Sequence, residues 1–150
     1  MTIIIKQLPA EELYIVEGLD TLCFGETQDQ ASREEYDRAT WWVAWDEDTP
    51  IAYTGVYVHD GHYMSLERSG VLPQYRGQGL QKKLIQTRLR YAKRHKIVTV
   101  YTYVSSANHA SVNSLFSQGL KSFSPEWPHA GEHPDEDCTF IYLRKIIKYP

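Results

Sequence analysis

Two closely spaced glycines beside an arginine are the residues whose spacing points most directly to chemistry. They occur in Arg76-Gly77-Gln78-Gly79, after an apolar segment that ends at Pro73 and before a leucine-spaced basic segment. Glycine lets the backbone pass close to a ligand, and the first N–H groups of a helix have no partner inside the helix. These groups and the positive end of the helix dipole attract anions. The pattern predicts an anion site suited to a phosphate or pyrophosphate.

The basic charge of the chain is concentrated around this segment. The formal net charge of the 150 residues is only −3. Residues 76–96 contain eight of the 16 lysines and arginines and no acid, whereas residues 1–60 contain 13 acids and three basic residues. Such asymmetry indicates an anionic ligand at one place and a cationic one at another, with a merely solvated basic helix face as the alternative. The acidic balance and the lack of a recognition motif argue against nucleic-acid binding.

Composition predicts one globular domain over residues 1–150, with 42% hydrophobic and 23% charged residues. No apolar run reaches the roughly 18 residues of a membrane span, and no charged-then-apolar leader opens the chain, so we expect a cytoplasmic protein without a membrane partner. Cys23 and Cys138 lie far apart in sequence, and we expect reduced thiols, although the sequence leaves a disulfide open.

Apolar periodicity predicts a mixed α/β domain in the order β-α-α-β-β-β-α-β-α-β-β. The predicted strands are residues 2–8, 41–46, 51–58, 63–72, 97–104, 121–124 and 138–147. The predicted helices are residues 9–24, 32–36 with a capping box of Ser32 and Glu35, a segment from Gly79 to Ala92 with its basic residues off the apolar face, and 108–119. The strand–helix–strand crossover is expected to be parallel, which puts the glycine loop where ligands bind such sheets.

Three phosphate-loop patterns compete for the glycine segment. A Walker loop needs Lys-Ser/Thr after its last glycine, but Gly79 is followed by Leu80. A dinucleotide fingerprint needs a third glycine where Lys82 stands. The stretch from Gln74 to Gly79, preceded by Val71-Leu72-Pro73, resembles the acyl-CoA-binding signature Gln/Arg-x-x-Gly-x-Gly/Ala of the GNAT superfamily of N-acetyltransferases.

The resemblance extends beyond the loop. Asn108 opens a helix that reads Asn-x-x-Ser and ends in Gly119-Leu120, similar to the second cofactor segment of that family. The resemblance implies a GNAT-type α/β (mixed α+β) fold with a central mixed, mostly antiparallel sheet of six to seven strands, splayed between strands four and five, and about four helices. It also implies that the chain is a single acetyltransferase domain.

The same resemblance implies roles for residues along the cofactor. The backbone of Val71 would pair with the pantetheine arm like an added strand, and Asn108 would hydrogen-bond that arm. The amides of residues 76–80 would wrap the pyrophosphate, with Arg76, Lys82 or Lys83 meeting the remaining phosphates. The implied acetyl-CoA-binding set is Val71, Arg76, Gly77, Gln78, Gly79, Leu80, Gln81, Lys82 and Asn108.

Acetyl transfer to an amine requires removal of a proton from the amine. Family members often use a glutamate of the fourth strand as the base, and Glu67 is the only acid on the predicted fourth strand. The alternative is that Glu67 only pairs with Arg68 or another cation. His59 and His62, which flank the preceding turn, are further candidates for the base.

The general acid is less defined. Many relatives place a tyrosine seven residues after the helix asparagine, where this chain has Leu115. Tyr101, Tyr103 and Tyr142 are possible substitutes, with packing as the alternative role of each. Thiolates are tolerable leaving groups, so no dedicated acid is required.

In this fold the acceptor cleft is lined by the first two helices and the loop before the last strand. Both segments are acidic here, and Trp41, Trp42 and Trp127 are expected to add aromatic walls, which suits a cationic amine. A solvated acidic surface is the alternative. His129, His133 and Cys138 do not form a standard zinc pattern, so no metal is predicted.

The sequence therefore predicts an acyl-CoA-dependent N-acyltransferase that transfers acetyl from acetyl-CoA to a primary amine by direct attack in a ternary complex. The alternatives are a non-catalytic acyl-CoA-binding or sensing module and a protein that binds another nucleotide. Exposed strand edges and tryptophans also lead us to expect a possible homodimer.

Overall fold

The computed structural model describes residues 2–25, 33–124 and 140–150. Within these ranges seven strands form one sheet in the order β1-β2-β3-β4-β5-β7-β6. The strands are β1 (Ile3–Gln7), β2 (Thr40–Asp46), β3 (Thr49–Val58), β4 (Tyr63–Val71), β5 (Thr99–Ser105), β6 (Lys121–Ser122) and β7 (Phe140–Ile146). The α-helices are α1 (Tyr14–Phe24), α2 (Arg33–Arg38), α3 (Leu80–Arg94) and α4 (His109–Ser117), with short 3-10 helices η1 (Ala10–Glu12) and η2 (Pro73–Tyr75). The predicted order of elements is confirmed.

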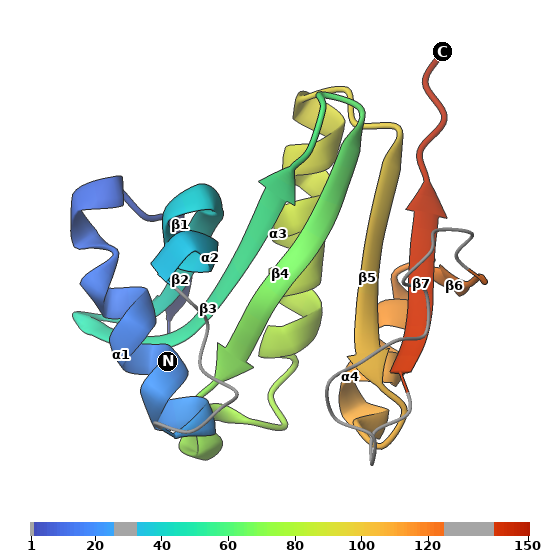
Figure 1. The fold of residues 1–150 in the computed structure, drawn as a ribbon. Helices are drawn as coiled ribbons and strands as arrows, with labels where there is room; N and C mark the ends of the chain where they lie inside the picture. Colours follow the sequence, from blue (N-terminus) through green and yellow to red (C-terminus); the bar gives the residue numbers. More distant parts are fainter. Residues whose placement is uncertain (1, 26–32, 125–139) are drawn as a thin grey trace.

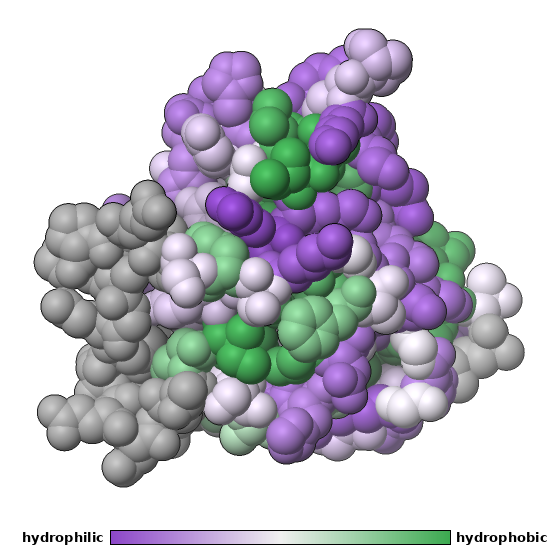
Figure 2. Space-filling view, turned by 90° about the vertical axis from the view of Figure 1, so that its right-hand side faces the viewer, coloured by the Kyte–Doolittle hydropathy of each residue, from purple (hydrophilic) through white to green (hydrophobic). Residues whose placement is uncertain are grey.

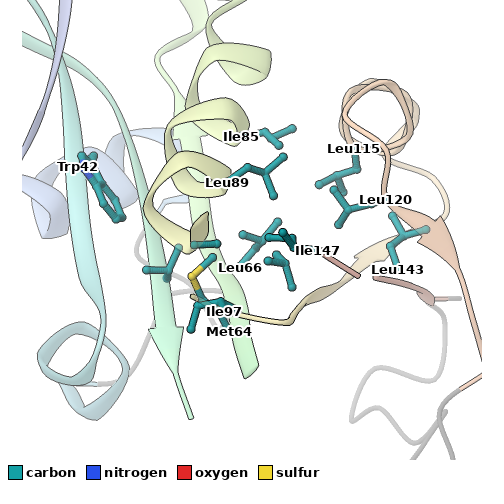
Figure 3. Packing of buried hydrophobic residues seen from close by; sticks show 13 residues of the cluster. Trp42, Met64, Leu66, Ile85, Leu89, Ile97, Leu115, Leu120, Leu143 and Ile147 are labelled. Carbon is teal, nitrogen blue, oxygen red and sulfur yellow. The ribbon is translucent and has the colours of Figure 1, made fainter. Parts of the chain in front are cut away.

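The helices cover the sheet on both faces. Figure 1 shows α3 and α4 behind the sheet and α1 and α2 in front of its N-terminal half. Alternation along β2 serves both layers, because Trp41 packs with Val16 of α1 while Trp42 joins the core cluster under α3. Figure 3 shows that second cluster, in which Ile85 and Leu89 of α3 face apolar side chains from α4 and β7.

The predicted role of two tryptophans is therefore wrong. Trp41 is 4% exposed and Trp42 is 3% exposed, and the cavity that Trp42 does line, of about 520 Å³, is formed by β1, β2 and α3 and not by the first two helices. The close packing of Trp41 also explains Gly55, since a Cβ at that position would lie 2.7 Å from the indole ring. Trp127 lies outside the described residues. The apolar body of both indoles is used for the core, which is where large aromatic side chains contribute most to stability.

Some predicted boundaries shift. The turn after β2 is shorter than expected, because Glu47 adopts a φ of 54° and lets β3 begin at Thr49. The first helix begins after Pro9 as a 3-10 turn and becomes α-helical at Tyr14. Of the expected strand 121–124, the part that pairs with β7 is Lys121–Ser122. Ser32 of the predicted capping box lies outside the described residues.

The parallel pair of β4 and β5 is short. Its register joins Tyr63 to Thr99, Met64 to Val100 and Ser65 to Tyr101, while every other neighbouring pair in the sheet is antiparallel. Beyond Ser65 the two strands diverge, as Figure 1 shows at their lower ends. The predicted mostly antiparallel sheet, splayed between the fourth and fifth strands, is confirmed.

None of the helices in the described ranges is both long and apolar enough to cross a bilayer. Seen from the side of β6 and β7, hydrophobic residues occur as separate patches among hydrophilic ones (Figure 2). A homodimer stays a prediction.

Candidate active site

The divergence of β4 from β5 opens a cavity of about 190 Å³. Its walls come from β4, α3, β5 and α4, so four elements that are distant in sequence meet around it. Among its lining residues are Glu67, Arg88, Tyr103, Asn108 and Leu115. The cavity thus brings together the predicted base, the predicted pantetheine ligand and one of the three candidate tyrosines.

Near the cavity, the C-terminal part of β4 is not paired with β5. The Leu72 N–H donates to the Ile51 carbonyl at 3.0 Å, which makes the adjacent Ala52–Val71 pair a non-hydrogen-bonded one. The polar groups of Val71 therefore face away from β3: its carbonyl accepts a hydrogen bond from the Arg76 Nε, and its N–H faces the space that β5 leaves beside β4. The same alternation applies to Ser69 two residues earlier. This edge can pair with an extended ligand as a sheet pairs with an added strand.

The glycine loop leads directly into α3. Gly77 has a φ of 78° and Gly79, the N-cap residue of α3, has a φ of 82°. A Cβ at either position would meet nothing within 4 Å, so it is the left-handed backbone, not crowding, that favours glycine. No side chain caps the helix, and the loop is exposed. The first N–H groups of α3 are therefore available to an anion.

The basic residues around the loop have different surroundings. The Arg76 Nε donates to the Val71 carbonyl at 2.9 Å, which ties the loop to the end of β4. Lys82 and Lys83 are exposed on the first turn of α3, and Gln81 is half-buried at the cavity. Arg76 thus has a structural contact that the sequence did not indicate.

Asn108 occupies the N-cap of α4, as predicted. Its Oδ1 accepts a hydrogen bond from the Ser111 N–H at 3.2 Å. With the oxygen used for the cap, the amide nitrogen of Asn108 is the group that can donate toward the cavity. Leu115, further along α4, is 4% exposed and packs in the core, so it adds only apolar surface to the cavity.

Glu67 lies on the β4 wall of the cavity with an ion-pair partner that the sequence did not identify. Its Oε1 accepts from the Arg38 Nη2 at 3.2 Å and from the Ser65 Oγ at 3.4 Å. The Ser65 Oγ also lies 3.2 Å from the His59 Nε2, so a chain of polar contacts runs from Glu67 to an exposed histidine. The suggested alternative partner Arg68 is instead bonded to Asp20.

Residues 9–119 match the sequence model of a family described as "Acetyltransferase (GNAT) family". The chain belongs to this family. It is therefore an acetyltransferase, and the predicted family and class of enzyme are confirmed. No curated protein matches the chain.

Solved GNAT structures share the fold of this acetyltransferase at low sequence identity. The ribosomal-protein-S18-alanine N-acetyltransferase from Escherichia coli superposes with a TM-score of 0.80 and 16% identity, over 99% of this chain and 96% of the other. A GNAT family acetyltransferase from Elizabethkingia anophelis with acetyl-CoA bound gives 0.72 and 16%, over 97% and 98%. The PaiA N-acetyltransferase from Thermoplasma acidophilum in complex with coenzyme A gives 0.74 and 16%, over 98% and 100%.

A buried carboxylate joins four elements of this GNAT acetyltransferase, and it reaches β4 through Arg68, the residue that follows Glu67. Asp20 of α1 is 1% exposed and accepts from the Tyr36 hydroxyl at 2.5 Å, from the Tyr53 hydroxyl, and from the Arg68 Nη2 at 3.0 Å. Burial raises the pKa of Asp20, but the hydrogen bonds from Tyr36, Tyr53 and Arg68 outweigh it and hold the pKa below its ordinary value. One signal was available in the sequence, since Asp20 falls four residues after Val16 on the apolar face of α1.

The three candidate tyrosines differ in their relation to the cavity. Tyr103 lines it, whereas Tyr101 stacks on His59 with ring centroids 5.6 Å apart and Tyr142 packs beside Tyr103 at 6.2 Å. Burial, followed by the nearby charge of Glu67, raises the pKa of Tyr103 above its ordinary value. The phenol is therefore protonated at neutral pH and able to donate a proton.

One basic residue of α3 departs from the predicted pattern. Arg88 is 3% exposed and lies on the buried face of the helix, one turn from Leu84 and one turn from Ala92. The expectation that the basic residues of this helix lie off its apolar face is wrong at this position. Burial lowers the pKa of Arg88 to about 9, an effect that the charge of Glu67 partly offsets.

Several predicted residues cannot be compared with the geometry. The acids of residues 26–32 and 125–139, together with His129, His133 and Cys138, lie outside the described residues. In the described acidic segment, Glu34 and Asp37 are exposed on α2. His62 is exposed in the turn before β4 and its backbone N–H donates to Asp60, so it does not line the cavity.

Proposed function

We propose that this GNAT acetyltransferase transfers an acetyl group from acetyl-CoA to a primary amine by direct attack in a ternary complex. The observation that carries the proposal is the meeting, at one cavity, of an unpaired β4 edge and the open N-terminus of α3. The first suits the pantetheine arm and the second suits the pyrophosphate. The structures from E. anophelis and T. acidophilum, which hold acetyl-CoA and coenzyme A, support the same cofactor.

The cofactor would bind along the wall of the cavity. The Val71 backbone and the Asn108 amide would hydrogen-bond the pantetheine arm, and the amides from Arg76 through Leu80, with Gly77, Gln78 and Gly79 between them, would surround the pyrophosphate. Gln81 and Lys82, on the first turn of α3, would meet the outer phosphates. Exposed lysines at this point add an attraction that salt weakens.

Glu67 would remove the proton from the attacking amine. It is the acid of the described residues that lines the cavity, and its side chain is 18% exposed, so it is accessible and still partly shielded from water. Arg38 and Ser65 fix one carboxylate oxygen, which leaves the other to face the amine. Tyr103 would donate a proton to the departing thiolate, replacing the tyrosine that Leu115 does not supply.

The acceptor would be a cationic small molecule or an amine on a protein. The acidic balance of residues 1–60 supports a cationic acceptor, because opposite charge raises its local concentration. The similar enzyme from E. coli is named for acetylating the alanine of a ribosomal protein, which supports a protein amine as the other class. A cytoplasmic location and a homodimer belong to the same proposal.

The test is a screen of amines with acetyl-CoA, in which free CoA thiol is detected. We expect amine-dependent CoA release by the wild-type protein and a fall of about 100-fold or more in Glu67→Gln, because a positioned base contributes about 10²–10⁴-fold. Binding of acetyl-CoA should persist in the variant. Glu47→Gln, an exposed glutamate of the turn between β2 and β3, is the matched control and should release CoA at the wild-type rate.

Two results would contradict the proposal. Thermal stabilisation by acetyl-CoA without CoA release for any amine would identify a non-catalytic acyl-CoA-binding module, which Leu115 in the usual tyrosine position favours. Stabilisation by ATP or NAD, with none by acetyl-CoA, would identify a protein for another nucleotide. Unchanged turnover by Glu67→Gln would remove only Glu67 from the mechanism.

A further inference from the structure

Arg88 is a cation embedded in the core between α3 and the sheet. Its neighbours on the same helix face, Leu84 and Ala92, are fully buried. The residue also borders the cavity that contains Glu67. A charge in such a position needs a physical reason, because charged side chains are almost never fully buried unless they are paired.

The guanidinium contacts the backbone where β3 and β4 fall out of register. Thr54 pairs with Ser69 and Val56 pairs with Leu66, so Gly55 faces two residues of β4. This arrangement is a β-bulge, which interrupts the ladder of hydrogen bonds and re-aims side chains. The Arg88 Nη1 lies 3.4 Å from the carbonyl oxygens of both Gly55 and Glu67, so it donates to the two strands at the bulge.

These two hydrogen bonds are too few to offset the cost of burying the charge of Arg88. Within the described part of the chain, its Nε has no hydrogen-bond partner and its guanidinium makes no salt bridge. The negative charge that acts on it is that of Glu67, whose carboxylate is paired with Arg38. Burying a charge with incomplete hydrogen bonding opposes folding, and replacing such groups with apolar residues is often neutral or stabilising.

We propose that Arg88 is a positioning residue that fixes the β4 bulge and thereby directs Glu67 into the cavity. This inference rests on the proposed function, in which Glu67 is the base. Local features that work against stability are expected at functional sites. A bulge that is free to relax would turn the Glu67 side chain away from the amine, and a misplacement of about 1 Å is enough to reduce turnover by about 100-fold.

The experiment compares Arg88→Met and Arg88→Lys with Arg94→Met, an exposed arginine on the same helix. For Arg88→Met we expect kcat to fall about 10- to 100-fold, with the KM for acetyl-CoA within about twofold of wild type. The melting temperature should equal or exceed that of wild type. Arg88→Lys keeps a cationic donor and should recover part of kcat, and Arg94→Met should match wild type in every measurement.

A double-mutant cycle shows whether Arg88 acts through Glu67. On a Glu67→Gln background, Arg88→Met should cause no further loss of turnover. Multiplicative losses, or a lower melting temperature that accounts for the lost activity, would overturn the inference, as would full turnover by Arg88→Met. If the wild-type protein binds acetyl-CoA but releases no CoA with any amine, the proposed function fails and takes this inference with it.

Discussion

Replacing Asp20 with asparagine removes the charge at the centre of the buried network that joins α1, α2, β3 and β4. The Asp20 side chain is fully buried and that of Arg68 is one quarter exposed, so the variant leaves a largely buried guanidinium without its counter-charge. Breaking such a pair costs about 3–5 kcal/mol. The hydroxyls of Tyr36 and Tyr53 also lose a charged acceptor, which supports that range without being added to it.

The expected loss is a large part of the stability of a domain of this size, which is about 5–15 kcal/mol. At about 2–4 °C per kcal/mol, the melting temperature should fall by about 6–20 °C. Urea unfolding measures the free energy of unfolding. Tryptophan fluorescence is a suitable signal, because Trp41 packs beside the network, with its ring centroid 6.1 Å from that of Tyr36. Asp37→Asn is the control, since that carboxylate is 58% exposed and its ion pair with Arg33 should contribute little.

The pH dependence gives a second check on Asp20. The pKa of Asp20 is lowered in the folded protein, so the stability from this group is present above the ordinary aspartate pKa and is lost as pH falls through the folded value. The difference between wild type and Asp20→Asn should therefore narrow below about pH 4. A melting temperature within about 2 °C of wild type at neutral pH would refute the reasoning, because the network would then contribute no more than a surface pair.

Two further predictions concern the cofactor loop and the proton donor. Gly79→Ala disfavours the φ of 82° by about 1–2 kcal/mol. The free loop of the variant can relieve this strain by leaving the binding conformation, so the Kd for acetyl-CoA should rise about tenfold in calorimetric titration, and an unchanged Kd would contradict a role of this loop geometry in binding. Tyr103→Phe should lower kcat about tenfold or more across pH 6–9, because the raised pKa of Tyr103 keeps the wild-type phenol protonated there. Equal kcat values of the two proteins in steady-state assays of CoA release would exclude Tyr103 as the acid.

The parts of the site that depend on neighbours in sequence could be predicted. A helix N-terminus after Gly79 requires only a local change of period and a residue that tolerates a positive φ. The cap at Asn108 requires only a side chain that reaches the Ser111 N–H three residues later. The order of helices and strands follows from apolar periodicities in the same way.

The electrostatic partners of the site were decided by the tertiary structure. Arg38 and Glu67 are 29 residues apart in sequence, and Asp20 and Arg68 are 48 apart, so no local pattern selects these pairs. They meet because β3 and β4 pair with a β4 bulge opposite Gly55 while α1 and α2 pack on one face. Sequence alone thus determined the glycine loop before α3 and the cap of α4, since caps and glycine turns are local. Only the packing of distant elements decided how Glu67 is held, because long-range charge pairs exist only once the chain has folded.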